Sequence, residues 1–258
     1  MTIPPVLYGH RGAPTERPEN TLISFERAVE LGATALETDV HMTSDGHIVI
    51  SHDASAERSA DQRAVIRDST WAQVCTWDVG WQYVAPDGSR PFAGQGVRMP
   101  QLDDVLKAFP DLRINIDVKQ QKPQMVEPLL AAIRAHDAEE RVTLASFASR
   151  TMREIRAAGF QGRTVLVRNE VLALVLSPES LARRFVAGDS AQVPTRAGLF
   201  NLGSRRFVDK CHALGLRVEY WTVNDAAEAE RLLGLGADGI MTDDPASIAP
   251  VFMRHHAG

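Results

Sequence analysis

The feature that most constrains the fold of this chain is a regular alternation of strand-like and helix-like segments. Short apolar runs typical of buried strands are separated by longer segments in which apolar residues recur at helical spacing. The eight predicted strands cover residues 6–9, 34–40, 113–118, 142–145, 164–167, 190–193, 216–221 and 238–241. Eight such repeats predict an α/β fold of the closed parallel (β/α)8 type, a TIM barrel. An open, doubly wound sheet is the alternative.

The segments between these strands carry helical signals. Leu22, Phe25 and Val29 recur at helical spacing within residues 21–31, where Asn20 is a candidate N-cap and Gly32 a stop. Further helices are predicted at residues 102–109, 125–136, 149–158, 178–185, 205–214 and 226–233. Residues 47–51 form one more extended segment, which follows a turn at residues 44–46.

Residues 54–100 interrupt this alternation. Glycines and prolines punctuate the segment, and it holds three of the four tryptophans, Trp71, Trp77 and Trp81. We expect a small loop-rich insertion after the second strand, without a core of its own, whose aromatic side chains pack onto the barrel. The whole chain, residues 1–258, is then a single TIM-barrel domain.

The composition excludes several classes of protein. A net charge of −5 argues against non-specific nucleic-acid binding, which requires a basic surface. No apolar run approaches the ~18 residues of a membrane span, and the first strand begins too early for a signal peptide. Cys75 and Cys211 lack metal-like spacing and are expected to be reduced thiols. We therefore expect a cytoplasmic, soluble protein without stable membrane association, and its oligomeric state stays open.

Two predicted strands carry charged residues on one face only. Glu37 and Asp39 share one face of the second strand, and Asn115, Asp117 and Lys119 share one face of the third. The opposite, apolar faces suit the surrounding helices, so the charged faces should point into the barrel near its C-terminal rim. Three carboxylates there favour a hard divalent cation such as Mg²⁺ or Ca²⁺. A purely structural ion pair between Lys119 and Asp117 is the alternative.

Histidines complete the expected site. His10 ends the first strand and His52 follows the extended segment, so both should reach this rim, as should Trp221, which we expect to line the substrate site. Two imidazoles can act as acid and base in phosphoryl transfer, while Arg11 and Lys119 can hold an anionic phosphate. The other histidines are expected to be buried hydrogen-bonding groups: His41, His47, His136, His212, His255 and His256.

A series of short motifs resembles the glycerophosphodiester phosphodiesterase family, in order and spacing, over nearly the whole chain. The motifs are His10-Arg11-Gly12, Pro18-Glu19-Asn20-Thr21, Glu37-x-Asp39-Val40, Thr43-x-Asp45-Gly46, His52-Asp53, Pro100-x-Leu102, Ile114-x-Ile116-Asp117-x-Lys119, Trp221-Thr222-Val223-Asn224 and Gly236-x-Asp238-Gly239-Ile240-x-Thr242-Asp243-x-Pro245. Each motif alone is weak, but the set is specific. Two positions depart from the usual pattern: Asp117 stands where Glu is usual, and residues 56–60 keep only Arg58 of a Leu-x-Arg-Thr-Thr run.

The resemblance implies a TIM barrel that hydrolyses glycerophosphodiesters to sn-glycerol 3-phosphate and an alcohol. It implies that His10 and His52 are the acid/base pair. It also implies that Arg11 and Lys119 contact the phosphate and that Glu19 and Asn20 line the site. The metal ligands that it implies are Glu37, Asp39 and Asp117, with Mg²⁺ or Ca²⁺ as the expected ion and Mn²⁺ as a further option.

The sequence therefore predicts a metal-dependent phosphodiesterase whose partner is a small-molecule glycerophosphodiester. Within the enzymes, the alternative is a phospholipase-type barrel acting on lysophospholipid or phosphoinositide head groups, which a long apolar groove or an exposed amphipathic lip would favour. Outside the enzymes, the alternative is a non-catalytic phosphodiester-binding protein. Three questions stay open: which alcohol is preferred, whether water or the substrate's own 2-hydroxyl attacks, and which histidine is the acid.

Overall fold

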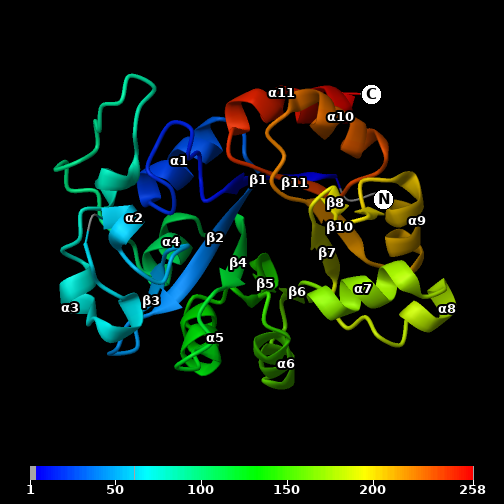
Figure 1. Ribbon diagram of the computed structural model, residues 1–258, viewed down its shortest axis with the longest axis horizontal. Coiled ribbons are helices and arrows are strands. Elements are labelled where there is room, and N and C mark those ends of the chain that lie inside the picture. Colours follow the sequence, from blue (N-terminus) through cyan, green and yellow to red (C-terminus); the bar gives the residue numbers. More distant parts are fainter. Residues whose placement is uncertain (1–3, 61, 258) are drawn as a thin grey trace.

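The computed structural model describes residues 4–60 and 62–257, which form a ring of parallel strands with helices around it (Figure 1). The eight barrel strands are β1 Val6–His10, β2 Ala35–Met42, β4 Arg113–Val118, β5 Val142–Ala145, β6 Arg163–Thr164, β7 Ser190–Val193, β10 Arg217–Tyr220 and β11 Gly239–Thr242. Their order is β6-β5-β4-β2-β1-β11-β10-β7, and each neighbouring pair is parallel. The predicted TIM barrel is confirmed, and the open sheet is wrong.

The barrel closes between β6 and β7 through few backbone contacts. An isolated parallel bridge joins Val165 to Ser190. Leu166 N donates to Ser190 O at 2.8 Å, and Asp189 N donates to Thr164 O at 2.7 Å. The cylinder therefore has one lightly bonded seam, on the side away from β1 and β2.

Most helices lie where the sequence predicts them. These are α1 Leu22–Glu30, α4 Leu102–Ala108, α5 Val126–Ala135, α6 Ser149–Ala157, α9 Arg205–Ala213 and α10 Ala226–Gly234. The helix predicted at residues 178–185 is shorter, α8 Glu179–Ala182. The sequence pattern does not predict α7 Arg168–Leu176 or α11 Pro245–Ala257. Helix α7 is apolar along most of its length, so it lacks the polar stripe that makes a helix recognisable.

The start of α1 differs from the prediction in a way that shapes the site. Thr21 is the N-cap instead of Asn20, and its Oγ1 accepts a hydrogen bond from Ser24 N at 3.3 Å. Asn20 lies outside the helix with φ +56, in the left-handed region. Gly32, with φ +100, ends the helix as predicted. Because Thr21 caps the helix, the Asn20 side chain is available for contacts inside the barrel.

The insertion after β2 has a small hydrophobic cluster of its own, which corrects the expectation of a coreless segment. Strand β3 Ile48–Ile50 pairs antiparallel with β2 and leads into α2 Glu57–Ala60, the 3-10 turns η1 Ile66–Asp68 and η2 Val79–Gln82, and α3 Trp71–Val74. The cluster comprises Val49, Ala56, Ala60, Ile66, Val74, Trp77, Val79 and Met99. Trp77 is buried in it, whereas Trp71 and Trp81 are partly exposed.

The apolar core lies mainly between the strands and the helices, and it forms two large clusters. One draws on residues 13–167, and the other draws mostly on residues 166–252. The apolar cluster inside the barrel is much smaller: Val6, Tyr8, Ala35 and Met241. Polar groups lie beside it, since Tyr8 Oη donates to Glu219 at 2.9 Å and Gln192 bridges Glu219 and Asn115 at 2.8 Å each. The barrel interior is therefore polar well below its rim.

Two expectations from composition can be compared with the structure. Cys75 and Cys211 are free thiols, the first partly exposed and the second buried. Within residues 4–60 and 62–257, no helix is both long enough and apolar enough to cross a bilayer.

Candidate active site

The charged strand faces meet at the C-terminal rim of the barrel, as predicted. His10 at the end of β1 is in register with Glu37 of β2, and Asp39 of β2 is in register with Asp117 of β4. All three carboxylates are buried, and Asp39 is only 1 % exposed. Lys119 follows β4, and its Nζ lies 2.9 Å from Asp39 Oδ1. Residues from three neighbouring strands thus form one charged cluster.

The loop after β1 brings Arg11 and Asn20 to this cluster. Both residues have φ +56, a left-handed conformation that costs free energy for residues other than glycine. Asn20 N donates to Arg11 O at 2.9 Å, which ties the two strained positions together. Gly12 follows with φ +95, and a Cβ at this position would collide with Ser24. The strained loop therefore sets the position of both side chains.

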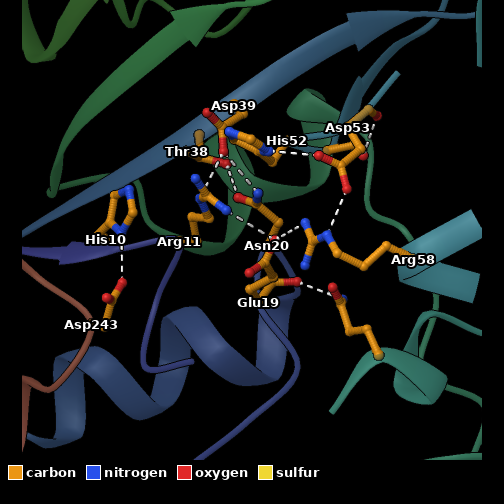
Figure 2. Close-up of polar contacts among 12 residues, drawn as sticks. His10, Arg11, Glu19, Asn20, Thr38, Asp39, His52, Asp53, Arg58 and Asp243 are labelled. Atoms are coloured by element: carbon orange, nitrogen blue, oxygen red, sulfur yellow. Dashed lines mark hydrogen bonds and ion pairs between the residues drawn. The ribbon is translucent and has the colours of Figure 1, made fainter. Parts of the chain in front are cut away.

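Asp39 takes part in several of the polar contacts that Figure 2 shows. It lies 3.2 Å from Arg11 Nε and accepts a hydrogen bond from Asn20 Nδ2 at 3.0 Å. Thr38 Oγ1 donates to Asn20 Oδ1 at 2.7 Å and so orients the amide. Burial alone would raise the pKa of Asp39, but Lys119 and Arg11 hold it below its usual range. Asp39 is therefore an ionised carboxylate at neutral pH.

The other two carboxylates are less well neutralised. Burial, together with the nearby Asp39 carboxylate, raises the pKa of Glu37 to about 8. Burial also raises the pKa of Asp117, against the opposing effect of Lys119, whose Nζ lies 2.6 Å from Asp117 Oδ2. The other oxygen of Asp117, Oδ1, is buried without a hydrogen-bond partner. Such carboxylates have the capacity to accept a further cation.

The ion pair that the sequence left open as a structural alternative is present. Lys119 donates to both Asp117 and Asp39, and although burial would lower the pKa of Lys119, these two carboxylates raise it. In the part of the chain that the structure describes, no group of three or more His, Cys, Asp or Glu side chains is arranged to hold a metal ion. A divalent cation would therefore compete with Lys119 and Arg11 for the carboxylate oxygens. The donor set fits such a cation because it consists of hard carboxylate oxygens.

His10 is held by a carboxylate that follows the last strand. Its Nδ1 lies 2.6 Å from Oδ1 of Asp243. Asn224 Nδ2 donates to Asp243 Oδ2 at 2.9 Å, and Asp243 N donates to Asn224 Oδ1 at the same distance. Burial would lower the pKa of His10, but Glu37 and Asp243 raise it above the ordinary histidine value. With Nδ1 engaged, Nε2 is left 3.8 Å from Glu37 and free to transfer a proton.

His52 is held in the same way by its neighbour Asp53. Nδ1 of His52 lies 2.7 Å from Asp53 Oδ1. Arg58 of α2 contacts both Asp53 Oδ2 and Glu19 Oε1 at 2.6 Å, and Glu19 Oε1 lies 3.2 Å from Arg11 Nη1. Burial would raise the pKa of Asp53, but Arg58 and His52 lower it. A continuous series of polar contacts thus connects His52 through the insertion to Arg11 (Figure 2).

Another part of the rim is apolar. Phe147 follows β5, is 68 % exposed, and packs edge-on against Trp221 with ring centroids 6.1 Å apart. Lys119 Nζ lies 5.6 Å from the centroid of the Phe147 ring. Trp221, which the sequence placed at the site, is thus connected to the charged cluster through Phe147.

The structure brings to the rim five residues to which the sequence pattern assigns no role: Asp53, Asp243, Asn224, Arg58 and Phe147. A carboxylate directly after the last strand is a signal that could have identified Asp243, because strand ends meet at this rim. Arg58 lies in the insertion, whose conformation the sequence pattern did not predict. Phe147 is a single aromatic residue in a loop, so no periodicity in the sequence indicates its place at the rim.

The expectation of buried, hydrogen-bonded histidines holds for His41, which is buried with its Nε2 3.3 Å from His52 O. The expected burial is wrong for the other histidines that the structure describes. These side chains are partly or fully exposed: His47, His136, His212 and His255. The first three of these nevertheless hydrogen-bond to a side chain. The side chain of His256 lies outside the part of the chain that the structure describes.

The groups at this rim suit the hydrolysis of a phosphate ester. They are two histidines with carboxylate partners, a carboxylate cluster and two cationic side chains. The chain belongs to the glycerophosphoryl diester phosphodiesterase family, whose sequence profile matches residues 10–247. The resemblance seen in the motifs is thereby confirmed, and the chain is an enzyme of the phosphoric diester hydrolase class.

Known proteins of this family are similar to the chain over nearly its whole length. A glycerophosphodiester phosphodiesterase of Caldanaerobacter subterraneus subsp. tengcongensis is 31 % identical over 248 residues, which cover 94 % of this chain and 96 % of the relative. Two solved structures share the fold at low sequence identity. The glycerophosphoryl diester phosphodiesterase domain of a Mycobacterium tuberculosis protein has a TM-score of 0.83 at 18 % identity, covering 98 % of this chain and 100 % of that one. An Oleispira antarctica phosphodiesterase, solved with its product sn-glycerol-3-phosphate, has a TM-score of 0.78 at 21 % identity, covering 96 % and 97 %.

Proposed function

We propose that the protein hydrolyses glycerophosphodiesters to sn-glycerol 3-phosphate and an alcohol, with a divalent cation and two histidines. The observation that carries this proposal is the pair of imidazoles, His10 and His52, each held through Nδ1 by a carboxylate at the rim of the charged cluster. Family membership supports the reaction class, and the product complex of the Oleispira antarctica relative supports the glycerol phosphate half of the substrate.

Arg11 and Lys119 are the groups that bind the phosphate in this proposal. Both form an ion pair with the buried Asp39, so their charges are held in place before any substrate binds. A guanidinium presents a planar fork to two phosphate oxygens, while the ammonium acts as a point charge. Preorganised cations stabilise the charge that develops on the phosphate in the transition state. Glu19, Asn20 and Trp221 line the site around them.

Glu37, Asp39 and Asp117 are the residues that would hold the divalent cation, Mg²⁺ or Ca²⁺. When bound, such a cation neutralises a non-bridging phosphate oxygen and polarises the phosphorus. The unpartnered Oδ1 of Asp117 and the raised pKa of Glu37 support the assignment, because a bound cation would contact the unpartnered oxygen and would stabilise the ionised form of Glu37, which burial and Asp39 disfavour. Lys119 remains close to the same carboxylates and shares their charge.

The two histidines move protons in this scheme. Each has Nδ1 engaged by a carboxylate, Asp243 for His10 and Asp53 for His52, which leaves Nε2 as the reactive nitrogen. One imidazole takes a proton from the nucleophile, which is water or the substrate's own 2-hydroxyl, and the other gives a proton to the departing alcohol oxygen. The carboxylate partners stabilise the imidazolium form that each ring passes through.

The experiment that tests this function is a coupled assay for glycerol 3-phosphate release from a panel of glycerophosphodiesters. We expect turnover by the parent protein, loss of turnover after chelation, and recovery on addition of Mg²⁺, Ca²⁺ or Mn²⁺. Full turnover in thoroughly metal-stripped protein would overturn the metal assignment. Release of no glycerol 3-phosphate from any diester would overturn the reaction.

Asp117→Glu sharpens the metal assignment, because glutamate is one methylene longer at a position where the family usually has it. Mg²⁺ demands short bonds and near-ideal octahedral geometry, whereas Ca²⁺ tolerates longer bonds and irregular geometry. We expect the substitution to change the ratio of Mg²⁺- to Ca²⁺-supported turnover without abolishing either. An unchanged ratio, with Glu37→Ala inactive, would remove Asp117 from the ligand set.

The exposed Phe147 beside Trp221 favours a second candidate, hydrolysis of lysophospholipids by the same site. Two apolar rings at the rim offer a surface against which an acyl chain can lie. The same panel separates the candidates when it includes a lysophospholipid. Faster turnover of the lysophospholipid than of every short, water-soluble diester would make it the preferred substrate.

A further inference from the structure

A short hairpin projects from the barrel after β7. Strands β8 Arg196–Ala197 and β9 Phe200–Asn201 pair antiparallel, and Gly198 and Leu199 form the two-residue turn between them. Gly198 has φ +58, which suits the first position of a tight hairpin turn. The turn leaves Leu199 fully exposed and Phe200 38 % exposed. Large apolar side chains therefore form the tip.

The base of this hairpin is fixed to the barrel. Leu202 is buried, and its carbonyl oxygen accepts a hydrogen bond from Tyr220 Oη at 2.7 Å. Thr195 O accepts from both Leu202 N and Gly203 N at 2.9 Å. The exposed tip thus extends from an anchored base.

The hairpin lies at the same rim as the active site. It follows the C-terminal end of β7, just as Phe147 follows β5 and Trp221 follows β10. In Figure 1 the hairpin is close to β7 and β10, where the chain is yellow. Apolar side chains at three strand ends therefore surround one half of the rim.

The charge of the segment is opposite to that of the protein. Residues 194–206 contain three arginines, Arg196, Arg205 and Arg206, and no aspartate or glutamate, whereas the chain carries a net charge of −5. All three arginines are exposed, and none of them forms an ion pair with the residues that the structure describes. Arg205 Nη2 donates at 2.8 Å to Gly234 O, at the C-terminal end of α10, which leaves Arg196 and Arg206 as the cations available beside the tip. An apolar tip flanked by unpaired cations fits a partner that is apolar inside and anionic at its surface.

We propose that this hairpin docks the rim reversibly onto an anionic lipid surface, with Leu199 and Phe200 inserted and Arg196 and Arg206 on the head groups. Burial of the two side chains provides the apolar contribution, and each arginine near an anionic leaflet adds to it. A second copy of the chain fits the charges less well. In a two-fold dimer through this hairpin, Arg196 and Arg206 would face the same two arginines of the second copy. The proposal extends beyond turnover and does not depend on it.

Sedimentation with phosphatidylcholine vesicles, prepared with and without phosphatidylglycerol, tests the docking. We expect the parent protein to bind the anionic vesicles and to be released by high salt. The double variant Leu199→Ser/Phe200→Ser should lower the partition coefficient about tenfold or more. Arg196→Gln should lower it about fivefold. The matched control is Leu176→Ser on α7, since Leu176 is 64 % exposed and should leave binding unchanged.

Three results would overturn the proposal: equal sedimentation with both vesicle types, unchanged binding of the double variant, or equal loss in the Leu176→Ser control. Sedimentation-equilibrium data showing a dimer that the double variant dissolves would make the occupant a second copy instead. Turnover of a water-soluble diester should be the same for parent and double variant. Failure of the turnover assay therefore leaves the sedimentation result interpretable.

Discussion

The rim of this barrel is divided into a charged half and an apolar half. Strands β1, β2 and β4 deliver His10, the carboxylates and Lys119, whereas β5, β7 and β10 are followed by Phe147, the β8–β9 hairpin and Trp221. Both halves occupy equivalent places in one fold. The barrel fold thus sets the position of each strand end at the rim. The residues that follow the strand determine whether that position is suited to catalysis or to apolar contact.

Both halves of the rim lower the stability of the fold, for different physical reasons. The charged half buries Glu37 among other carboxylates and holds Arg11 and Asn20 in left-handed conformations, which cost on the order of 1–3 kcal/mol each. The apolar half leaves Phe147 and Leu199 in water, although burying such a side chain stabilises a protein by about 1.5–3 kcal/mol. Neither arrangement improves the fold, and this supports a functional reason for each.

The largest expected effect lies in the charged half, at the histidines. His10→Ala and His52→Ala should each lower kcat by on the order of 10²–10⁴-fold, because each removes one proton-transfer group. The melting temperature of each variant should stay near that of the parent. His212→Ala is the control, since His212 pairs with Asp238 away from the rim. A variant that turns over near the parent rate would remove that histidine from the acid/base pair.

Lys119→Ala should lower kcat/KM on the order of 10²-fold, because a preorganised charge at the phosphate is lost. The melting temperature should change less than the kinetics. Lys210→Ala is a matched control, since Lys210 Nζ donates to a backbone carbonyl, Ser177 O, away from the rim. A large fall in melting temperature with intact kinetics would make Lys119 a purely structural partner of Asp117.

Asp243→Asn should lower kcat about tenfold or more while leaving KM nearly unchanged. The amide keeps the shape of the carboxylate but removes the charge that supports a protonated His10. Asp238→Asn is the matched control, because Asp238 forms a similar pair with His212 at 2.8 Å. If both variants lose only stability, Asp243 has no role in orienting His10.

The smallest expected effect lies in the apolar half. Phe147→Ala should raise KM for a soluble diester about two- to fivefold with kcat unchanged, because the ring contacts Lys119 but no proton-transfer group. Phe185→Ala removes an exposed ring on another element and serves as the control. A fall in kcat of tenfold or more for Phe147→Ala would contradict the division of the rim.

The sequence pattern predicts most of the barrel and most of the charged half. Alternation along β2 and β4 placed Glu37, Asp39 and Asp117 on inward faces, because successive side chains of a strand point to opposite sides and the apolar side suits the helices. Buried charges are rare without a partner, and this marked the inward faces as a candidate site. Burial and register bear out that placement. The roles of these residues as ligands stay predictions, since no contact with a metal is described.

What the sequence pattern missed depends on contacts between distant segments. Helix α7 is apolar on nearly all sides, so no helical stripe marks it. Asp243 pairs with His10 across 233 positions, and the contact exists only once the barrel has closed. Trp77 forms a small core within the insertion, which glycine and proline content alone made look like loop. Local periodicity has no information on such pairings.

The two outer apolar clusters have a consequence for how the enzyme loses activity on heating. The N-terminal cluster supports the strands that carry the carboxylates, whereas the C-terminal cluster includes Leu7 of β1, the strand that ends in His10, and Ile240 of β11, the strand that precedes Asp243. The lightly bonded seam between β6 and β7 lies where the two clusters meet. Cooperative units of a protein open separately when few contacts join them. Loosening of the C-terminal part would therefore move His10 and Asp243 away from the carboxylates and inactivate the enzyme before the carboxylate cluster itself comes apart.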